Sequence, residues 1–156
     1  EHLARHQAAD LFLDTFVVNA HTTASDALWA GLPVLTMPGR QFASRVGASL
    51  VSAMGLPEMI TKSAAEYEAR ALELARDPDA LAALRSKLQR NRRSAPLFDT
   101  TGFTRRLEQG FDMAHERYLQ GLPPAHIDVT DSPALGATPP HWPLRTPSVA
   151  PAVSAP

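Results

Sequence analysis

A short apolar run, a polar loop and a helix stopped by glycine constrain this chain most. Residues 11–14 are expected to form a buried strand, because a brief hydrophobic run between polar residues is typical of one. Residues 24–30 are expected to form a helix that ends at Gly31 and Pro33. Between the two lie His21, Thr22 and Thr23. The pattern therefore predicts that these three residues stand at a helix N-terminus, on the carboxyl edge of a strand.

Such a helix N-terminus favours an anion. Its first backbone N–H groups have no partner within the helix, and the helix dipole adds positive potential. The hydroxyls of Thr22 and Thr23 would add donors for a diphosphate, and Asp26, about one turn further on, could accept ribose hydroxyls. The alternative is an ordinary helix with Thr22 or Thr23 as its N-cap, since the chain has no glycine-rich phosphate loop.

Strands and helices alternate through the first 60 residues. Further short strands are expected at 33–37 and 59–60, separated by a helix over 43–54. That helix carries apolar residues at the spacing of one buried face: Ala43, Val46, Leu50 and Met54. The alternation predicts an α/β fold with a parallel sheet, in which ligands bind beyond the carboxyl ends of the strands.

The next part of the chain is predicted to be helical. Ser63 and Glu66 form a capping box at the start of one helix, and Asp77-Pro78 begins another. The sequence Asp77-Pro78-Asp79 resembles an Asp-x-Asp motif that holds a divalent ion, but helix capping explains it better. The basic residues at the end of that helix are expected to be solvated: Arg85, Lys87, Arg90, Arg92 and Arg93.

A last helix over residues 100–119 is expected to pack across a neighbouring element. Its predicted buried residues are Phe103, Leu107, Phe111, Ala114 and Tyr118. After Gly121 the composition changes, because nine of the 14 prolines fall in the last 36 residues. Residues 1–121 are therefore expected to form a lobe, and residues 122–156 an extended or disordered proline-rich tail.

Composition narrows the possible partners. The net charge of −1 gives no electrostatic reason to expect nucleic acid or an anionic membrane, and no apolar run is long enough to span a bilayer. The chain has no cysteine, which excludes disulfides and thiolate metal sites and is compatible with a cytoplasmic location. Because the chain begins at Glu1 and enters a helix almost at once, it is expected to be a piece of a longer protein.

His2 and Arg5 lie three residues apart and would share a helix face. A base could stack on the imidazole while the guanidinium donates to its oxygens, although a solvated surface pair is the simpler interpretation. Signatures of serine hydrolases, zinc proteases and P-loop enzymes are missing from the sequence.

A long ordered series of residues resembles the C-terminal lobe of the protein O-linked N-acetylglucosaminyltransferases, and most of all a bacterial homologue. The similar segments span roughly residues 1–121: Glu1-His2 through Asp14-Thr15, Asn19-Ala20-His21-Thr22-Thr23, Asp26, Leu28-Trp29-Ala30-Gly31, Thr36-Met37-Pro38-Gly39, Ala43-Ser44-Arg45-Val46, Tyr67-Glu68 and Ser94 through Thr100.

The resemblance implies the Rossmann-like C-terminal lobe of a GT-B glycosyltransferase, which binds UDP-N-acetylglucosamine. His2 and Arg5 match residues at the uridine, and Asp26 matches the carboxylate at the ribose. His21, Thr22 and Thr23 match residues at the diphosphate. In that family a protein serine or threonine hydroxyl attacks the anomeric carbon with inversion, and UDP leaves without a metal ion or other cofactor.

The resemblance also implies what this chain lacks. The family's diphosphate lysine, its candidate bases, its acceptor groove and its helical repeats all lie upstream of Glu1, so no catalytic residue is assigned here and the chain alone should be inactive. Animal members have glycine at the positions of Ala20 and Ala24, and cysteine at that of Val18. The sequence therefore predicts the donor-binding half of a transferase acting on protein hydroxyls. Alternatives are a GT-B enzyme with another acceptor, a nucleotide-sugar epimerase and a non-catalytic protein-binding scaffold.

Overall fold

The computed structural model describes residues 1–129, and residues 130–156 lie outside the described part. Helices alternate with two short parallel strands, so the predicted α/β class is confirmed. The elements run in the order α1 (His2–His6), β1 (Phe12–Leu13), α2 (Thr22–Ala30), β2 (Val34–Leu35), η1 (Phe42–Ser44), α3 (Val46–Ala53), η2 (Pro57–Met59), α4 (Ala64–Arg76), α5 (Pro78–Asn91), η3 (Pro96–Phe98) and α6 (Thr100–Leu119).

The strands are parallel, as predicted, but shorter than the ranges 11–14 and 33–37. Phe12 lies opposite Val34 and Leu13 opposite Leu35. The backbone N–H of Asp14 donates to Leu35, which extends the pairing by one residue. The predicted third strand is reduced to a single parallel bridge between Thr36 and Ile60. The sheet is thus short, and the loop after β1 begins at the edge where the carboxyl ends of both strands lie.

Helix α2 follows that loop and is fixed by its buried side. Ala24, Ala27 and Leu28 are fully buried in the core. The helix ends at Gly31, whose φ of 90° is left-handed, and the next amide, that of Leu32, donates back to the Ala27 carbonyl. The predicted glycine stop is confirmed, and the helix begins at Thr22, two residues earlier than the predicted range 24–30.

The predicted helix over 43–54 is wrong in its first turn. Residues Phe42–Ser44 form a 3-10 turn, and α3 begins only at Val46. The reason is that the carbonyls of Ala43 and Ser44 accept tertiary bonds from Asn19 and Gly39 and do not join a helical ladder. The fully buried stripe consequently differs from the predicted one, and consists of Gly47, Val51 and Met54.

Two predicted helix starts are confirmed by their caps. The Ser63 hydroxyl accepts from the Glu66 amide at 3.2 Å, while the Glu66 carboxylate accepts from the amide of Lys62, one residue earlier than in a standard capping box. The Asp77 carboxylate accepts from the Ala80 amide at 2.9 Å. This bond supports the capping interpretation of Asp77-Pro78-Asp79.

The basic end of α5 is not the solvated surface that the sequence predicts. Arg85 donates to the Ala9 carbonyl and pairs with Asp10 at 3.3 Å. Lys87 pairs with Glu58 at 2.7 Å. Arg85 and Lys87 therefore link α5 to other elements, and so does Arg92, just after the helix, as described below. Arg90 and Arg93 are exposed.

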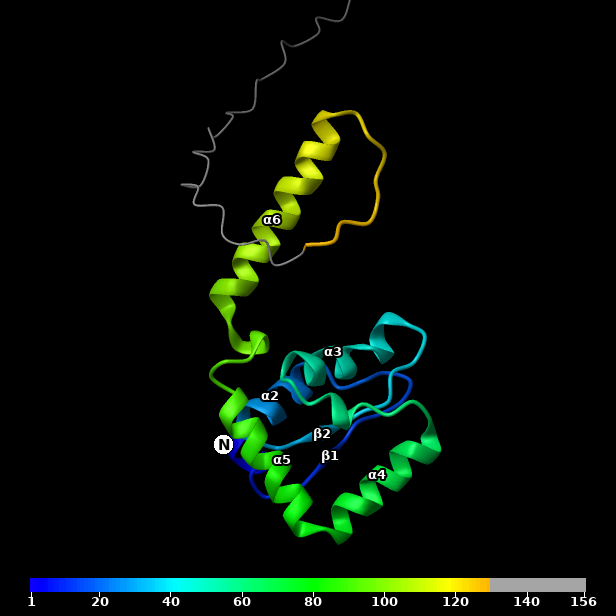
Figure 1. Cartoon of the computed structure of the whole chain (residues 1–156), viewed down its shortest axis with the longest axis vertical. Coiled ribbons are helices and arrows are strands. Elements are labelled where there is room, and N and C mark those ends of the chain that lie inside the picture. The colour runs from blue at the N-terminus through cyan, green and yellow to red at the C-terminus, as the bar shows by residue number, and fades with distance from the viewer. Residues whose placement is uncertain (130–156) are drawn as a thin grey trace, which may run out of the picture.

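Helix α6 has the predicted bounds but not the predicted packing. Figure 1 shows it extending away from the part of the molecule that holds β1 and β2. No residue of α6 is buried. The predicted buried residues are all exposed instead: Phe103, Leu107, Phe111, Ala114 and Tyr118. The predicted packing of these residues against a neighbouring element is therefore wrong within residues 1–129.

Residues 122–129 contain neither helix nor strand and lie against α6, where the Arg117 side chain donates to the Pro123 carbonyl at 2.6 Å. The rest of the predicted tail, residues 130–156, falls outside the described part. Of the helices in residues 1–129, none combines the length and apolarity that crossing a membrane requires.

One buried carboxylate, Asp14, ties the sheet to the loop before α2. Its Oδ1 accepts from the amides of Thr15 and Ala20, at 2.9 and 2.7 Å. Its Oδ2 accepts from the Thr36 hydroxyl at 2.6 Å. The Tyr67 hydroxyl donates to the Asp14 carbonyl at 2.9 Å. Asp14 therefore joins β1, the following loop, the end of β2 and α4.

Asn19 and Gly47 complete this arrangement. The Asn19 side chain donates to the Thr15 carbonyl at 2.7 Å and accepts from the Gly47 amide at 3.1 Å. A Cβ at position 47 would overlap Asp14 Oδ2 and lie 2.6 Å from the Thr36 hydroxyl oxygen. Close approach of α3 to the Asp14 carboxylate thus requires glycine at position 47.

We expect Gly47→Ala to lower the free energy of unfolding by about 1–3 kcal/mol, because the added methyl group must displace a hydrogen-bonded carboxylate. Urea unfolding measures the change. Gly110→Ala on exposed α6 is the matched control, since its Cβ meets only Val129 at 3.4 Å and alanine favours a helix. Equal effects of the two substitutions would contradict the close packing at Gly47.

Burial and the nearby Asp14 carboxylate raise the pKa of Tyr67 to about 12, from an ordinary value of 10. Because the folded state holds the neutral phenol, this group stabilises the fold below pH 10, and the contribution is lost as the pH rises towards 12. Tyrosinate absorbance during a pH titration, taken as the difference between the protein and its Tyr67→Phe variant, should therefore show its midpoint near 12. A midpoint near 10 would contradict the burial.

Candidate functional site

The candidate site is the N-terminus of α2, which faces the carboxyl edge of the strands. His21 is the N-cap, and its side chain makes no capping hydrogen bond. The alternative in which Thr22 or Thr23 caps the helix is therefore wrong, since both residues lie inside it. Both threonines are exposed, and within residues 1–129 neither hydroxyl has a hydrogen-bond partner in the structure. Two hydroxyls and the first-turn amides are thus available to an anion.

His21 itself is exposed and held from one side. Its Nε2 lies 3.4 Å from the Ala43 carbonyl oxygen, and its ring meets the Phe42 ring edge to face, with centroids 6.2 Å apart. The backbone N–H of Asn19, two residues earlier, donates to the same Ala43 carbonyl at 2.8 Å. The 3-10 turn that the sequence did not predict thus forms one wall of the site.

Asp26 lies on α2, one turn after the threonines. Its side chain is 34% exposed, and its Oδ2 lies 3.2 Å from His2 Nε2 on α1. Arg5, one turn further along α1, is exposed and makes no hydrogen bond or ion pair through its side chain within the described chain. The structure therefore brings His2 directly to Asp26 and places Arg5 on the same short helix.

The other end of α2 is fixed by α5 and η3. The Arg92 guanidinium donates to the Trp29 carbonyl at 3.0 Å and lies over the Trp29 ring at 5.3 Å. The Phe98 ring contacts the same indole, with centroids 4.9 Å apart. Because both ends of the helix are held, its N-terminus is a rigid support for a ligand.

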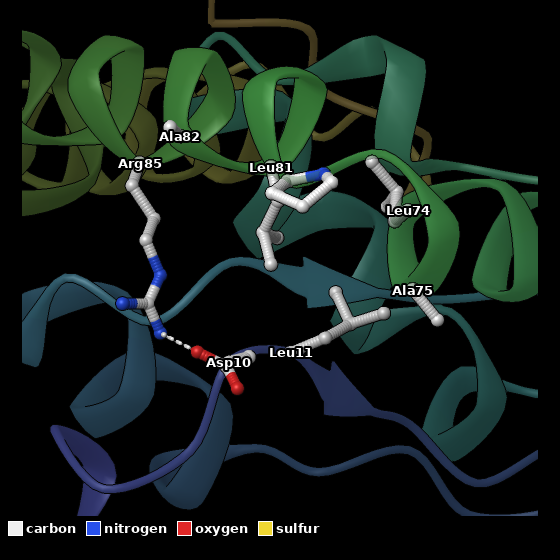
Figure 2. A pocket seen from close by; sticks show the side chains of 8 residues that line it. Asp10, Leu11, Leu74, Ala75, Leu81, Ala82 and Arg85 are labelled. Carbon is white, nitrogen blue, oxygen red and sulfur yellow. Dashed lines mark ion pairs between the residues drawn. The ribbon is translucent and has the colours of Figure 1, made fainter.

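A cavity among the described residues lies elsewhere. Figure 2 shows it between α4, α5 and the segment that leads into β1. Its volume is about 480 Å³. Its walls are largely aliphatic, including Leu11, Leu74 and Leu81, and the Arg85–Asp10 ion pair lies at its side. This is the amino end of β1, opposite the candidate site. None of the predicted site residues lines the cavity, so it has no part in the site.

The residues that hold the site were not all predicted. Asp14 appeared as the last residue of the predicted strand and within the resemblance, and Asn19 only within the resemblance, although a carboxylate at the end of a strand is a signal for such a role. Tyr67 also appeared within the resemblance, but nothing in the sequence linked it to Asp14, 53 residues away. Gly47 gave no signal. For a metal, residues 1–129 bring together no group of three histidine, aspartate or glutamate side chains that could bind one.

A family model described as glycosyl transferase family 41 matches residues 1–107. A Caenorhabditis elegans UDP-N-acetylglucosamine–peptide N-acetylglucosaminyltransferase is 42% identical over 127 residues, which are 81% of this chain and 11% of that protein. A probable enzyme of the same description from Arabidopsis thaliana, SEC, is 40% identical over 133 residues, 85% of this chain and 14% of that one.

The structure is similar to that of the Thermobaculum terrenum O-GlcNAc transferase mutant K341M, with a TM-score of 0.72 and 37% identity over 76% of this chain and 23% of that one. The chain thus spans about a quarter or less of the relatives that it matches. These findings confirm the resemblance and, with it, the α/β lobe of a GT-B glycosyltransferase. The chain belongs to glycosyl transferase family 41.

Proposed function

We propose that this chain is the donor-binding half of an inverting glycosyltransferase that moves N-acetylglucosamine from UDP-N-acetylglucosamine to serine and threonine hydroxyls of proteins. One observation supports this most: a family 41 chain presents an exposed helix N-terminus whose two threonine hydroxyls have no partner in the described structure. The activities for which these relatives are named support the same donor and acceptor classes.

The diphosphate would bind at the start of α2. The amides of the first turn and the hydroxyls of Thr22 and Thr23 can donate to phosphate oxygens, and the helix dipole favours the negative charge. His21 adds a third side chain at the same end. The uridine would lie towards α1, where Asp26 can accept the ribose hydroxyls and His2 and Arg5 can contact the base.

The proposed reaction places two demands on this chain. The acceptor hydroxyl forms a new bond to the anomeric carbon and gives up its proton, while the bond from that carbon to the β-phosphate oxygen breaks. Negative charge then grows on the departing UDP, and the amides and hydroxyls at α2 stabilise it. The helix N-terminus thus serves both to bind the donor and to stabilise its leaving group. We propose that neither a metal ion nor another cofactor takes part, as the resemblance implies.

Other parts of the reaction belong to the rest of the full-length protein. We propose that the proton acceptor, a lysine at the diphosphate, the N-terminal lobe and helical repeats that present protein substrates all precede Glu1. The relatives, which are several times longer than this chain, leave room for them. On this proposal the chain alone binds donor and does not catalyse transfer. The proposed location is the cytoplasm, where a chain without cysteine loses nothing by lacking disulfides.

The scaffold alternative has one observation in its favour. The apolar stripe of α6 is exposed, with Phe103 at 63% and Tyr118 at 77%, and such a stripe is typical of a surface that another protein element covers. A scaffold needs no nucleotide, however, so binding of UDP separates the two functions.

We predict that Asp26→Ala weakens the binding of UDP and of uridine to a similar extent, by about 10- to 100-fold, because both ligands lose the hydrogen bonds that their ribose hydroxyls donate to the Asp26 carboxylate. Thr22→Ala should weaken the binding of UDP about fivefold and that of uridine hardly at all, because only UDP carries phosphate. Calorimetry on the full-length protein measures both affinities.

Thr104→Ala is the matched control, since this threonine lies on α6 and its hydroxyl donates to the Thr100 carbonyl. It should leave both affinities unchanged. If Asp26→Ala and Thr22→Ala each lower the two affinities by the same factor, the assigned roles are wrong. If UDP does not bind the unmodified protein, the scaffold function is favoured.

A further inference from the structure

The contact between His2 and Asp26 joins an exposed helix to one that is anchored in the core. Helix α1 has five residues, none of them buried. Helix α2 has nine, and three of them lie in the core. The contact between His2 Nε2 and Asp26 Oδ2, 3.2 Å apart, joins these two helices. Asp26 is thus carried by the helix that is anchored in the core, and His2 reaches it from the exposed helix.

The Asp26 carboxylate has a free oxygen. Its Oδ2 faces His2, whereas no hydrogen bond to Oδ1 occurs within residues 1–129. The side chain is about one-third exposed, so without a partner the carboxylate could rotate about its own bonds in water. An Nε2–H donor that holds Oδ2 would fix this rotation. It would also leave Oδ1 directed at whatever lies in the site.

The imidazole can play this part whether neutral or protonated, because Nε2 carries a hydrogen in the charged form and in one of the two neutral tautomers. The ring is also held at a second point. It meets the His6 ring edge to face, with centroids 5.3 Å apart and planes at 88°. Contacts with a helix neighbour and with Asp26 together restrict how the His2 ring can turn.

From this geometry we infer that His2 is a positioning residue for Asp26: its Nε2–H holds one carboxylate oxygen so that the other accepts a ribose hydroxyl of the nucleotide. The inference rests on the proposed function and adds a role to the contact with the base that the resemblance implies for His2. On this inference, recognition of the ribose depends on His2, although His2 need not contact the ribose.

The two roles of His2 predict different losses. A residue that only stacks on the base, or only holds α1 in place, affects every uridine nucleotide equally. A residue that positions Asp26 affects only nucleotides whose ribose hydroxyls bind Asp26. The test therefore compares UDP with 2′,3′-dideoxy-UDP, which keeps the base and the diphosphate but lacks both hydroxyls. The ratio of the two affinities in one protein also cancels any loss of folded material.

The measurement is calorimetric binding of both nucleotides to the full-length protein. In His2→Phe, which keeps an aromatic ring but loses the donor, UDP should bind about tenfold more weakly while dideoxy-UDP changes less than about twofold. In His2→Gln, whose amide can donate from a similar position, the ratio of the two affinities should stay close to that of the unmodified protein, even if both affinities fall. His6→Phe is the control on the same helix: it keeps an aromatic ring beside His2 and should leave the ratio unchanged.

Equal losses for both nucleotides in His2→Phe would overturn the inference while UDP binding itself remains. A ratio that His2→Gln fails to restore would also overturn it. The proposed function fails in a different way, which Asp26→Asn detects. If this substitution leaves the preference for UDP over dideoxy-UDP unchanged, or if the unmodified protein binds neither nucleotide, Asp26 is not the ribose carboxylate.

Discussion

The buried carboxylate of Asp14 is the interaction on which the site depends. It accepts three hydrogen bonds within 2.9 Å, two from the loop that leads to α2 and one from the hydroxyl of Thr36 at the end of β2. A charge with so little access to water is stable only when such donors surround it. Asp14 therefore fixes where the loop leaves the sheet, and so where the N-terminus of α2 begins.

Helix α2 is held by contacts that do not involve the hydroxyls at its N-terminus. In many helices a serine or threonine hydroxyl caps the first turn, but here Thr22 and Thr23 stand inside the helix and neither hydroxyl bonds to any of residues 1–129. The position of α2 is instead secured by Asp14 on one side and by Arg92 at its other end. Because these contacts hold the helix, its donors remain available for a diphosphate.

Local sequence signals predicted the elements around the site well. The strand before Asp14, the glycine stop at Gly31 and the caps at Ser63 and Asp77 were all predicted, because each depends on residues that are neighbours in the chain. The placement of His2 beside Asp26 agrees with the grouping that the resemblance implied. The roles assigned to the site residues are still predictions.

What the sequence did not predict depends on contacts between distant segments. The 3-10 turn at Phe42–Ser44 forms because Asn19 and Gly39 bond its carbonyls, and nothing in residues 42–44 indicates this. The cations at the end of α5 resemble a solvated surface until their partners, such as Glu58 and Trp29, are known. On α6, periodicity identified the apolar face but could not say whether this chain supplies a cover for it.

The most direct test of the central claim is a crystal structure of the full-length protein with UDP. We predict that the phosphate oxygens lie within hydrogen-bonding distance of the Thr22 and Thr23 amides or hydroxyls, and that an Asp26 carboxylate oxygen accepts a ribose hydroxyl. A diphosphate bound away from the start of α2, or threonine side chains turned from it, would contradict the account.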